Sequence, residues 1–426
     1  MTDTNPASPR PNAASAAPAT PEVAGIGTAA NLSEYARNWL VRVRAGDTGA
    51  LPVIAGLIIL AVIFQTLNQN FLTPGNLVNL MVQGAVYMLF SLGMIFILLL
   101  GEIDLSIGFI GGVAGVVTAL LIYGNSGWPW YLGLAAGLLS AIGIGLFNGI
   151  IITGIGLPAF IVTLAGLLAW NGVMLIILGN GGTIPINNDM INNLANGLLD
   201  PTVSWIVGAA IVVIICGDMF LSYRRRKHSL EPISVLWLKM AGIAIAGIVV
   251  VWLCNVNRGR LTPIEGVPWV LLIVFGFAAL WTVVLKRTRF GTYIYAIGGN
   301  AEAARRAGIA VNRIRIAVFT IAGFMGGVAG IIYASRLRSV STNLDGGQLV
   351  LYCIAAAVIG GTSLFGGRGK AISAILGGLV IASIDNGMGL LGLSAAARYV
   401  VTGIVLVIAV TIDALASRGR ASSGLG

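Results

Sequence analysis

Charged side chains are scarce in this sequence. They make up 9% of its 426 residues, whereas a soluble globular protein carries about 25%. Hydrophobic residues make up 57%, in long uninterrupted runs that do not fit the roughly ten-residue alternation of a membrane β-barrel. One helical span needs about 20 apolar residues, so about twelve spans leave no room for a large soluble catalytic domain. The composition therefore predicts an all-α polytopic membrane protein with about twelve spans.

Residues that build catalytic and metal sites are also few. The one histidine, His228, lies in a basic connection with no second metal ligand nearby, so we expect no metal site. Three cysteines fall inside expected spans and form no disulfide framework: Cys216, Cys254 and Cys353. Residues 366–371 only weakly resemble a phosphate-binding loop, because Leu364 replaces its first glycine and Ala371 replaces the Ser or Thr that would hold magnesium. We expect no enzyme activity, no cofactor and no ATP binding by this chain alone.

Twelve apolar runs are candidate membrane spans. They cover residues 51–67, 77–100, 105–123, 131–151, 159–178, 205–221, 240–256, 269–285, 316–334, 349–364, 371–391 and 399–416. The run at 349–364 is short, and the run at 105–123 directly follows an acidic pair. Either is a candidate for a broken or re-entrant helix, so ten to twelve full spans are compatible with the sequence.

The basic residues predict the orientation of these spans. When the spans are threaded from a cytoplasmic N-terminus, all but five of the 25 Lys and Arg residues fall on the cytoplasmic side, as the positive-inside rule requires. The five on the outside are Arg258, Arg260, Arg336, Arg338 and Arg398. This placement accounts for the net charge of +10 without a nucleic-acid partner. It predicts a multi-pass chain in the lipid bilayer with both termini in the cytoplasm.

The two ends of the chain differ from the spans. Residues 1–48 begin with an Ala-, Pro-, Ser- and Thr-rich stretch that cannot offset the entropy of ordering, so we expect a disordered cytoplasmic tail. Residues 32–44 fit either an interfacial helix or an ordinary linker into the first span. The transmembrane domain is expected over residues 49–417, followed by a short cytoplasmic tail at 418–426.

Acidic and amide groups at membrane depth are the candidate transport residues, because burying them in a bilayer is costly. The acidic ones are Glu102, Asp104 and Asp385, and Asn148, Thr163 and Asn386 add uncharged polar groups. The expected spans contain no Lys or Arg away from their ends, which favours neutral polyols over anions as cargo. For Asp104 there is a structural alternative, because its carboxylate could cap the helix expected to begin at residue 105.

A short helix outside the bilayer is predicted in the long basic connection at 286–315. Asn300 can cap it, Glu302 suits its positive end, Arg305 and Arg306 suit its negative end, and Gly308 can adopt the left-handed stop. Such a helix has no apolar core of its own. We therefore expect it to pack against another protein.

Several motifs together resemble one transporter family. They lie at residues 101–108, 147–149, 157–164, 295–304, 360–363, 366–367 and 385–388. Taken together, they resemble the ribose/xylose-type permease subunits of bacterial ABC importers, and the likeness runs from about residue 77 to residue 413. Within that family, the 385–388 run and the polar connections at 180–201 and 222–239 look most like xylose permeases. Asn171 departs from the arginine expected there, so a contact made by that arginine is in doubt.

The resemblance implies an assembly and a set of site residues. The assembly would be a permease homodimer in the bacterial inner membrane, with ABC ATPase subunits on the cytoplasmic side and a periplasmic sugar-binding protein. The predicted substrate path comprises Glu102, Asp104, Asn148, Phe160, Thr163, Asp385 and Asn386. The predicted ATPase-coupling helix comprises Asn300, Glu302, Ala303, Ala304, Arg305, Arg306 and Gly308.

Other functions are compatible with parts of this pattern. A ribose or other monosaccharide importer would share every motif. An ion-driven secondary transporter could use Glu102, Asp104 and Asp385 as a proton relay, and a passive channel would need no energy input. The capped cytoplasmic helix favours the ABC importer, since an ion-driven carrier needs no element for docking an ATPase.

Overall fold

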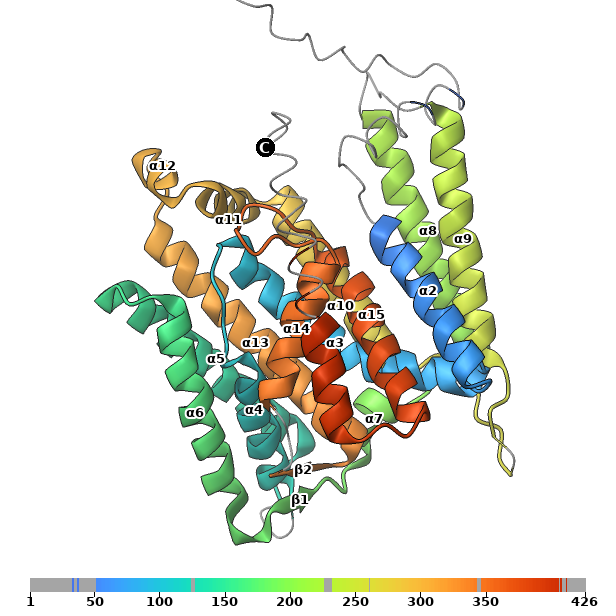
Figure 1. The fold of residues 1–426 in the computed structure, drawn as a ribbon, viewed down its shortest axis with the longest axis horizontal. Coiled ribbons are helices and arrows are strands. Elements are labelled where there is room, and N and C mark those ends of the chain that lie inside the picture. The colour runs from blue at the N-terminus through green and yellow to red at the C-terminus, as the bar shows by residue number, and fades with distance from the viewer. Residues whose placement is uncertain are drawn as a thin grey trace, which may run out of the picture.

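The computed structural model describes Ser33, Arg37 and residues 51–123, 127–225, 232–259, 261–342, 346–405, 407 and 411. Most of the expected N-terminal tail and all of the expected C-terminal tail lie outside these residues, as does His228. In the described part, helices account for every expected span (Figure 1).

Eight of the described helices are long and apolar enough to cross a membrane. They are α3 (Pro74–Leu99), α5 (Trp130–Ile155), α6 (Ala159–Leu178), α8 (Pro201–Arg225), α9 (Ile233–Asn255), α10 (Trp269–Arg287), α13 (Val311–Leu337) and α15 (Ala371–Leu390). Four shorter apolar helices are α2 (Leu51–Leu67), α4 (Ile107–Ile122), α14 (Gly346–Ile359) and an unlabelled last helix at Ala395–Val405. Each of the twelve overlaps one apolar run of the sequence, so the all-α polytopic class is confirmed.

Short elements connect these helices. They are a 3-10 turn at Gly179–Gly181, β1 (Thr183–Pro185), α7 (Asp189–Asn196), α11 (Arg289–Gly299), α12 (Ala301–Arg306) and β2 (Ser339–Ser341). The two strands pair antiparallel, with Thr183 opposite Ser341 and Pro185 opposite Ser339. The sequence analysis missed this small sheet, because three residues are too few for a strand periodicity to be recognised.

The centre of the molecule is built by α3, α4, α13, α14 and α15. In the most apolar 18-residue window, 89% of the residues of α3 are buried, compared with 6% for α8. Glycine permits close helix approach in this core. A Cβ atom on Gly330 of α13 would lie only 2.1 Å from the Gly111 carbonyl oxygen of α4.

The helices α4 and α14 start beside each other inside this core. After α3, the chain turns back into the molecule over residues 100–106 before α4 begins (Figure 1). The first turn of α4 touches the start of α14, because a Cβ on Gly108 would lie 2.2 Å from the Gly346 carbonyl oxygen. Halfway along its length, at Gly115, α4 passes Val340 of β2. The helix α14 leads to the 360–370 loop, where the Gly367 N–H donates to the Leu99 carbonyl. The two short helices thus run in opposite directions from a shared starting point, which we call the junction of Gly108 and Gly346. Their runs are the two that the sequence marked as candidates for broken helices.

The pair α8 and α9 lies at the edge of the molecule (Figure 1). A small apolar cluster joins it to α3 and α10 and consists of Val78, Val251, Cys254, Val267 and Leu271. An exposed ion pair between Asp218 of α8 and Arg287 of α10 adds a second link. Most of the surface of α8 and α9 is therefore apolar and faces outward.

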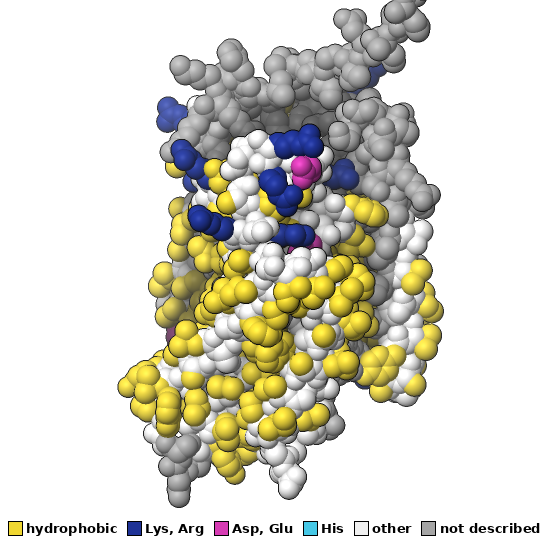
Figure 2. All heavy atoms as spheres, turned by 90° about the vertical axis from the view of Figure 1, so that its left-hand side faces the viewer, with side chains coloured by type: hydrophobic (Ala, Val, Ile, Leu, Met, Phe, Trp, Pro, Cys, Tyr) yellow, Lys and Arg dark blue, Asp and Glu magenta, His cyan; other side chains and the backbone are white. Residues whose placement is uncertain are grey.

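Charged side chains are concentrated at one end of the molecule along the direction of the helices. In Figure 2 the Lys and Arg side chains gather toward one end of the visible face, above a broad hydrophobic band. This is the end at which α11 and α12 lie in Figure 1. A band with charge concentrated beyond one edge is the pattern of a protein embedded in a bilayer.

Candidate functional site

The expected path residues form two separate polar clusters. The junction cluster surrounds the start of α4 and consists of Asp104, Ser106, Asn148 and Thr163. The Asp385 cluster lies among α3, α14, α15 and the last helix and consists of Gln83, Tyr87, Gln348, Tyr352, Asp385, Arg398 and Thr402. Glu102 lies close to the first cluster in sequence, and Asn386 lies next to the second.

The junction cluster is organised by Asp104, which is fully buried. One carboxylate oxygen, Oδ1, accepts hydrogen bonds from the Ser106 N–H at 2.8 Å and from the Ser106 hydroxyl at 2.6 Å. The other oxygen, Oδ2, has no hydrogen-bond partner among the described residues. Asp104 is not the N-cap residue of α4, because the helix begins at Ile107 and its N-cap is Ser106, whose side chain forms no cap hydrogen bond. The Asp104 carboxylate closes the turn that leads into the helix. The free oxygen leaves acceptor capacity for a further donor.

Two neighbouring helices hold the same cluster from the side. The Asn148 amide on α5 donates to the Ser106 hydroxyl at 3.1 Å, and the Thr163 hydroxyl on α6 donates to the Ile103 carbonyl at 3.3 Å. Both side chains are buried. The structure therefore brings together three of the predicted path residues: Asp104, Asn148 and Thr163.

Glu102 has a basic partner that the sequence analysis missed. Its carboxylate forms an ion pair with the Arg315 guanidinium near the start of α13, and its side chain is only 9% exposed. The positive-inside placement of the spans put Arg315 in a cytoplasmic connection. It gave no indication that the Arg315 side chain turns toward Glu102. The pair links the segment that follows α12 to the connection that carries Asp104.

Phe160 lies outside both clusters. It is the second residue of α6 and is 54% exposed, whereas Thr163, three residues later, faces inward. Phe160 therefore does not join Asp104, Asn148 and Thr163 in the junction cluster. Phe160 is exposed although it lies only three residues from the buried Thr163, and a path role for Phe160 stays a prediction.

Asp385 gathers side chains from distant parts of the chain. Its Oδ2 oxygen accepts from the Tyr87 hydroxyl at 2.6 Å and from the Gln83 amide. The Arg398 guanidinium lies 3.9 Å from Oδ1. Gln83 and Tyr87 are four residues apart and share one face of α3, a signal that the apolar character of the run at 77–100 concealed. Arg398 was expected outside the membrane, but its side chain reaches back to α15.

The remaining members of the Asp385 cluster surround Tyr352. The Gln348 amide donates to the Tyr352 hydroxyl at 2.8 Å, and the Thr402 hydroxyl lies 3.4 Å from the same oxygen. Next to this cluster, Asn386 and Asn76 exchange side-chain hydrogen bonds of 2.8 and 3.1 Å. Both predicted residues, Asp385 and Asn386, therefore form side-chain hydrogen bonds with α3.

The short capped helix predicted in the 286–315 connection is present as α12. The Asn300 side chain accepts from the Ala303 N–H at 2.9 Å, and Gly308 has a φ of +83°, in the left-handed region that favours glycine. Glu302 pairs with Arg305 at 3.1 Å and with Arg306 at 3.4 Å, and all three side chains are more than half exposed. Such exposed pairs contribute little to stability. The charged surface of α12 is therefore available to a partner.

Ala304 differs from the expectation for this helix. We expected both Ala303 and Ala304 to allow close approach of a partner protein, but only Ala303 is exposed. Ala304 is 5% exposed and belongs to the apolar core of this chain. Helical geometry places adjacent residues on different sides, so Ala304 anchors the helix instead of meeting a partner.

Comparison with known proteins agrees with the sequence resemblance. A family model described as the permease component of branched-chain amino acid transport systems matches residues 76–410. The Xylose transport system permease protein XylH of Escherichia coli K12 is 36% identical over 375 residues, which are 86% of this chain and 92% of that protein. XylH of Haemophilus influenzae is 32% identical over 370 residues, covering 85% of this chain and 95% of the relative.

A ribose relative is also similar. The Ribose import permease protein RbsC of Bacillus subtilis is 33% identical over 358 residues, covering 84% of this chain and 90% of that protein. No solved structure matches the chain. The family match and the near full-length identities agree with the twelve apolar helices and the capped helix α12. The chain therefore belongs to the permease-component family of branched-chain amino acid transport systems and is an ABC importer permease of the ribose/xylose type.

Proposed function

We propose that this chain is the membrane-spanning subunit of a binding-protein-dependent ABC importer that moves a neutral monosaccharide, most specifically xylose, into the cell. ATP hydrolysis in partner subunits drives the transport, and the chain itself is not an enzyme. The observation that carries this proposal is the similarity to XylH over 86% of this chain and 92% of the relative. Xylose ranks above ribose because identity to XylH of E. coli exceeds that to RbsC of B. subtilis, 36% against 33%.

The chemistry of the two clusters supports a neutral cargo. The two arginines near them, Arg315 and Arg398, each face an acidic side chain, Glu102 and Asp385. Neither cluster therefore offers an unpaired cation to an anionic substrate. Carboxylates, carboxamides and hydroxyls can accept from and donate to sugar hydroxyls.

The proposed partners fit opposite ends of the molecule. ATPase subunits dock on α12 at the basic end, and a periplasmic sugar-binding protein delivers its cargo at the end that carries β1, β2 and α7. A second copy of the chain completes the membrane unit. Both termini then lie in the cytoplasm of a bacterial cell, in agreement with the positive-inside rule.

Reconstitution of the whole importer tests this proposal. The chain, its ATPase and its binding protein are placed in proteoliposomes, with ATP inside the vesicles and labelled xylose or ribose with the binding protein outside. We expect uptake that requires both ATP and the binding protein, with xylose faster than ribose. Uptake that follows a proton gradient without ATP would contradict the proposal and would favour a relay through the buried carboxylates.

Docking on α12 has its own test. Arg305→Glu reverses a charge on a side chain that is 60% exposed, so we expect binding-protein-stimulated ATP hydrolysis and uptake to fall while the stability of the isolated chain stays unchanged. Ala304→Trp is a contrasting variant, because it adds bulk to a buried position and should reduce the yield of folded protein. Unchanged hydrolysis and uptake in the assembled Arg305→Glu complex would remove α12 from the docking surface.

A further inference from the structure

The Asp385 cluster has the composition of a site for hydroxyl groups. It contains one carboxylate, one guanidinium, two carboxamides, two phenols and one aliphatic hydroxyl, supplied by four helices. Together these groups offer hydrogen-bond donors and acceptors in several directions. The rings of Tyr87 and Tyr352 pack edge to face, with centroids 5.1 Å apart and an interplanar angle of 76°. They add aromatic surface that can contact the C–H groups of a sugar ring.

Part of the hydrogen-bonding capacity of this cluster is unused. Tyr87 and Gln83 both donate to Oδ2 of Asp385, whereas the Arg398 guanidinium is 3.9 Å from Oδ1, which is longer than a hydrogen bond. The Nε–H of Arg398 donates to the Leu393 carbonyl at 3.1 Å. Oδ1 and the terminal nitrogens of Arg398 can therefore accept from and donate to an incoming pair of hydroxyls with a small adjustment.

The cluster is also partly accessible, unlike the junction cluster. The side chains of Arg398 and Asp385 are 33% and 12% exposed, and Gln83 and Gln348 are half-buried. Asp104, in contrast, has no exposed surface. Tyr87, Tyr352 and Thr402 are buried, so a solute reaches the cluster from the side of Asp385 and Arg398.

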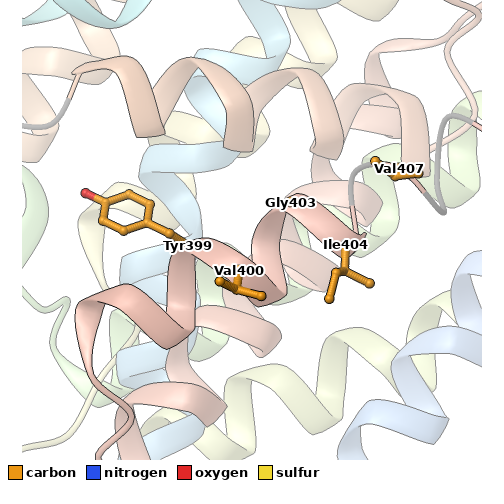
Figure 3. Close-up of a pocket in the computed structure, with 5 residues that line it drawn as sticks. All are labelled: Tyr399, Val400, Gly403, Ile404 and Val407. Carbon is orange, nitrogen blue, oxygen red and sulfur yellow. The ribbon is translucent and has the colours of Figure 1, made fainter.

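The last helix separates this polar cluster from an apolar surface. Tyr399, Val400, Gly403, Ile404 and Val407 line a shallow apolar hollow on one side of it (Figure 3). Arg398 and Thr402 are four residues apart and occupy another face, from which they reach Asp385 and Tyr352. The helix thus covers the cluster with a polar face and turns an apolar face away from it.

We propose that the Asp385 cluster is a binding site for the hydroxyl groups of the transported polyol. Asp385 and Arg398 bind neighbouring hydroxyls, the pair Tyr87 and Tyr352 contacts the ring, and Gln83, Gln348 and Tyr352 select the hydroxyl pattern. This inference rests on the proposed sugar transport and names the residues that perform the recognition. Packing between four helices does not require these polar groups, since apolar side chains of similar volume stabilise a core at least as well.

The test removes one hydroxyl from the cluster and asks whether sugars are affected unequally. Tyr352→Phe deletes the oxygen that Gln348 and Thr402 contact and keeps the ring. Tyr399→Phe is the matched control, because it deletes the same group from the face of the last helix that lines the apolar hollow. Each variant is reconstituted with the ATPase, and initial uptake rates are measured for xylose, ribose and single-deoxy xyloses, each at a saturating concentration of the loaded binding protein.

We expect Tyr352→Phe to lower uptake of at least one fully hydroxylated sugar by about threefold or more relative to its deoxy analogue, the factor that one lost hydrogen bond is worth. Binding-protein-stimulated ATP hydrolysis should stay near the wild-type rate. The control should change all sugars by less than about twofold. Gln348→Ala is a second variant with the same expected selectivity change, in case Tyr352→Phe assembles poorly.

Two results would overturn the inference in distinguishable ways. If the wild-type complex imports several of these sugars but both cluster variants leave their relative rates unchanged, the cluster has a structural role and sugar transport stands. If the wild-type complex imports none of them, the proposed function fails and the site fails with it.

Discussion

Asp104 and Asp385 are both aspartates inside the membrane domain, but their surroundings differ in origin. The hydrogen bonds of Asp104 come from Ser106, two residues later in the chain. Those of Asp385 come from Gln83 and Tyr87, which lie 302 and 298 residues earlier. A carboxylate that accepts from a residue two positions later closes a local turn, whereas one that accepts donors from a distant helix is a place where a ligand can compete. On the proposal above, we therefore expect mainly structural work from Asp104 and recognition from Asp385.

The strongest way to break the junction is to add volume where α4 meets α14. Gly108→Val places a branched side chain where a single Cβ would already lie 2.2 Å from the Gly346 carbonyl oxygen. Because the obstacle is backbone, we expect the yield of folded, monodisperse protein to be lost, beyond the about 1–3 kcal/mol of ordinary overpacking. Gly172→Ala on α6 is the control, since an added methyl meets nothing within 4 Å. If both variants gave the same yield of folded protein, the junction would be able to accommodate an added side chain.

A smaller effect is expected from the ion pair beside the junction. Glu102→Gln leaves Arg315 without its partner, and the loss of stability should be below the about 3–5 kcal/mol of a fully buried pair, because 32% of the Arg315 side chain is exposed. Thermal unfolding in detergent measures it. The double variant Glu102→Gln with Arg315→Gln should be less destabilised than either single variant. Additive losses would mean that the pair carries no coupling between α13 and the 100–106 connection.

Asp385→Asn tests the recognition side of the comparison. It removes the negative charge facing Arg398 while keeping a side chain that still accepts from Tyr87, so we expect sugar uptake to fall at least about tenfold, the equivalent of about 1.4 kcal/mol, with normal membrane insertion. Asp218→Asn is the matched control, because the pair of Asp218 with Arg287 is more than half exposed on both sides and contributes little. A comparable loss of uptake in the control would indicate a general charge effect.

The smallest change is expected at Asp104 itself. Asp104→Asn keeps an oxygen that can accept from Ser106, so both stability and uptake should stay closer to wild type than in Asp385→Asn. Asp104→Ala removes the acceptor of both Ser106 hydrogen bonds and should cost about 0.5–1.5 kcal/mol for each. Thermal unfolding and uptake measured on the same preparations separate the two effects. If Asp104→Asn lost uptake as strongly as Asp385→Asn at unchanged stability, Asp104 would belong to the path.

What the sequence could predict follows from the same contrast between local and distant contacts. Apolar runs, the cap by Asn300 and the stop at Gly308 depend on neighbours within a few residues, and the structure contains all of them. The partners Arg315 of Glu102 and Arg398 of Asp385 depend on how helices pack. Charge alone assigns both arginines to positions outside the spans. It could not show that their long side chains reach inward from helix ends.

The buried position of Ala304 and the polar face of α3 were hidden for a related reason. In α12 the alanines at 301, 303 and 304 are alike in the sequence, which does not reveal which of them packs on its own chain. In α3, two polar side chains among apolar neighbours do not disturb a hydropathy average, although Gln83 and Tyr87 meet the same carboxylate oxygen. Only the placement of α15 against α3 assigns these residues a role.

The most direct test of the account is sugar uptake by Asp385→Asn, measured in ATP-loaded proteoliposomes that contain the chain with its ATPase and, outside, a saturating binding protein. The wild-type complex should import sugar only with ATP and the binding protein present. The variant should hydrolyse ATP in response to the binding protein yet import sugar at least about tenfold more slowly. Uptake by the variant at the wild-type rate would contradict the assignment of recognition to the Asp385 cluster, and wild-type uptake without ATP would contradict the proposed importer.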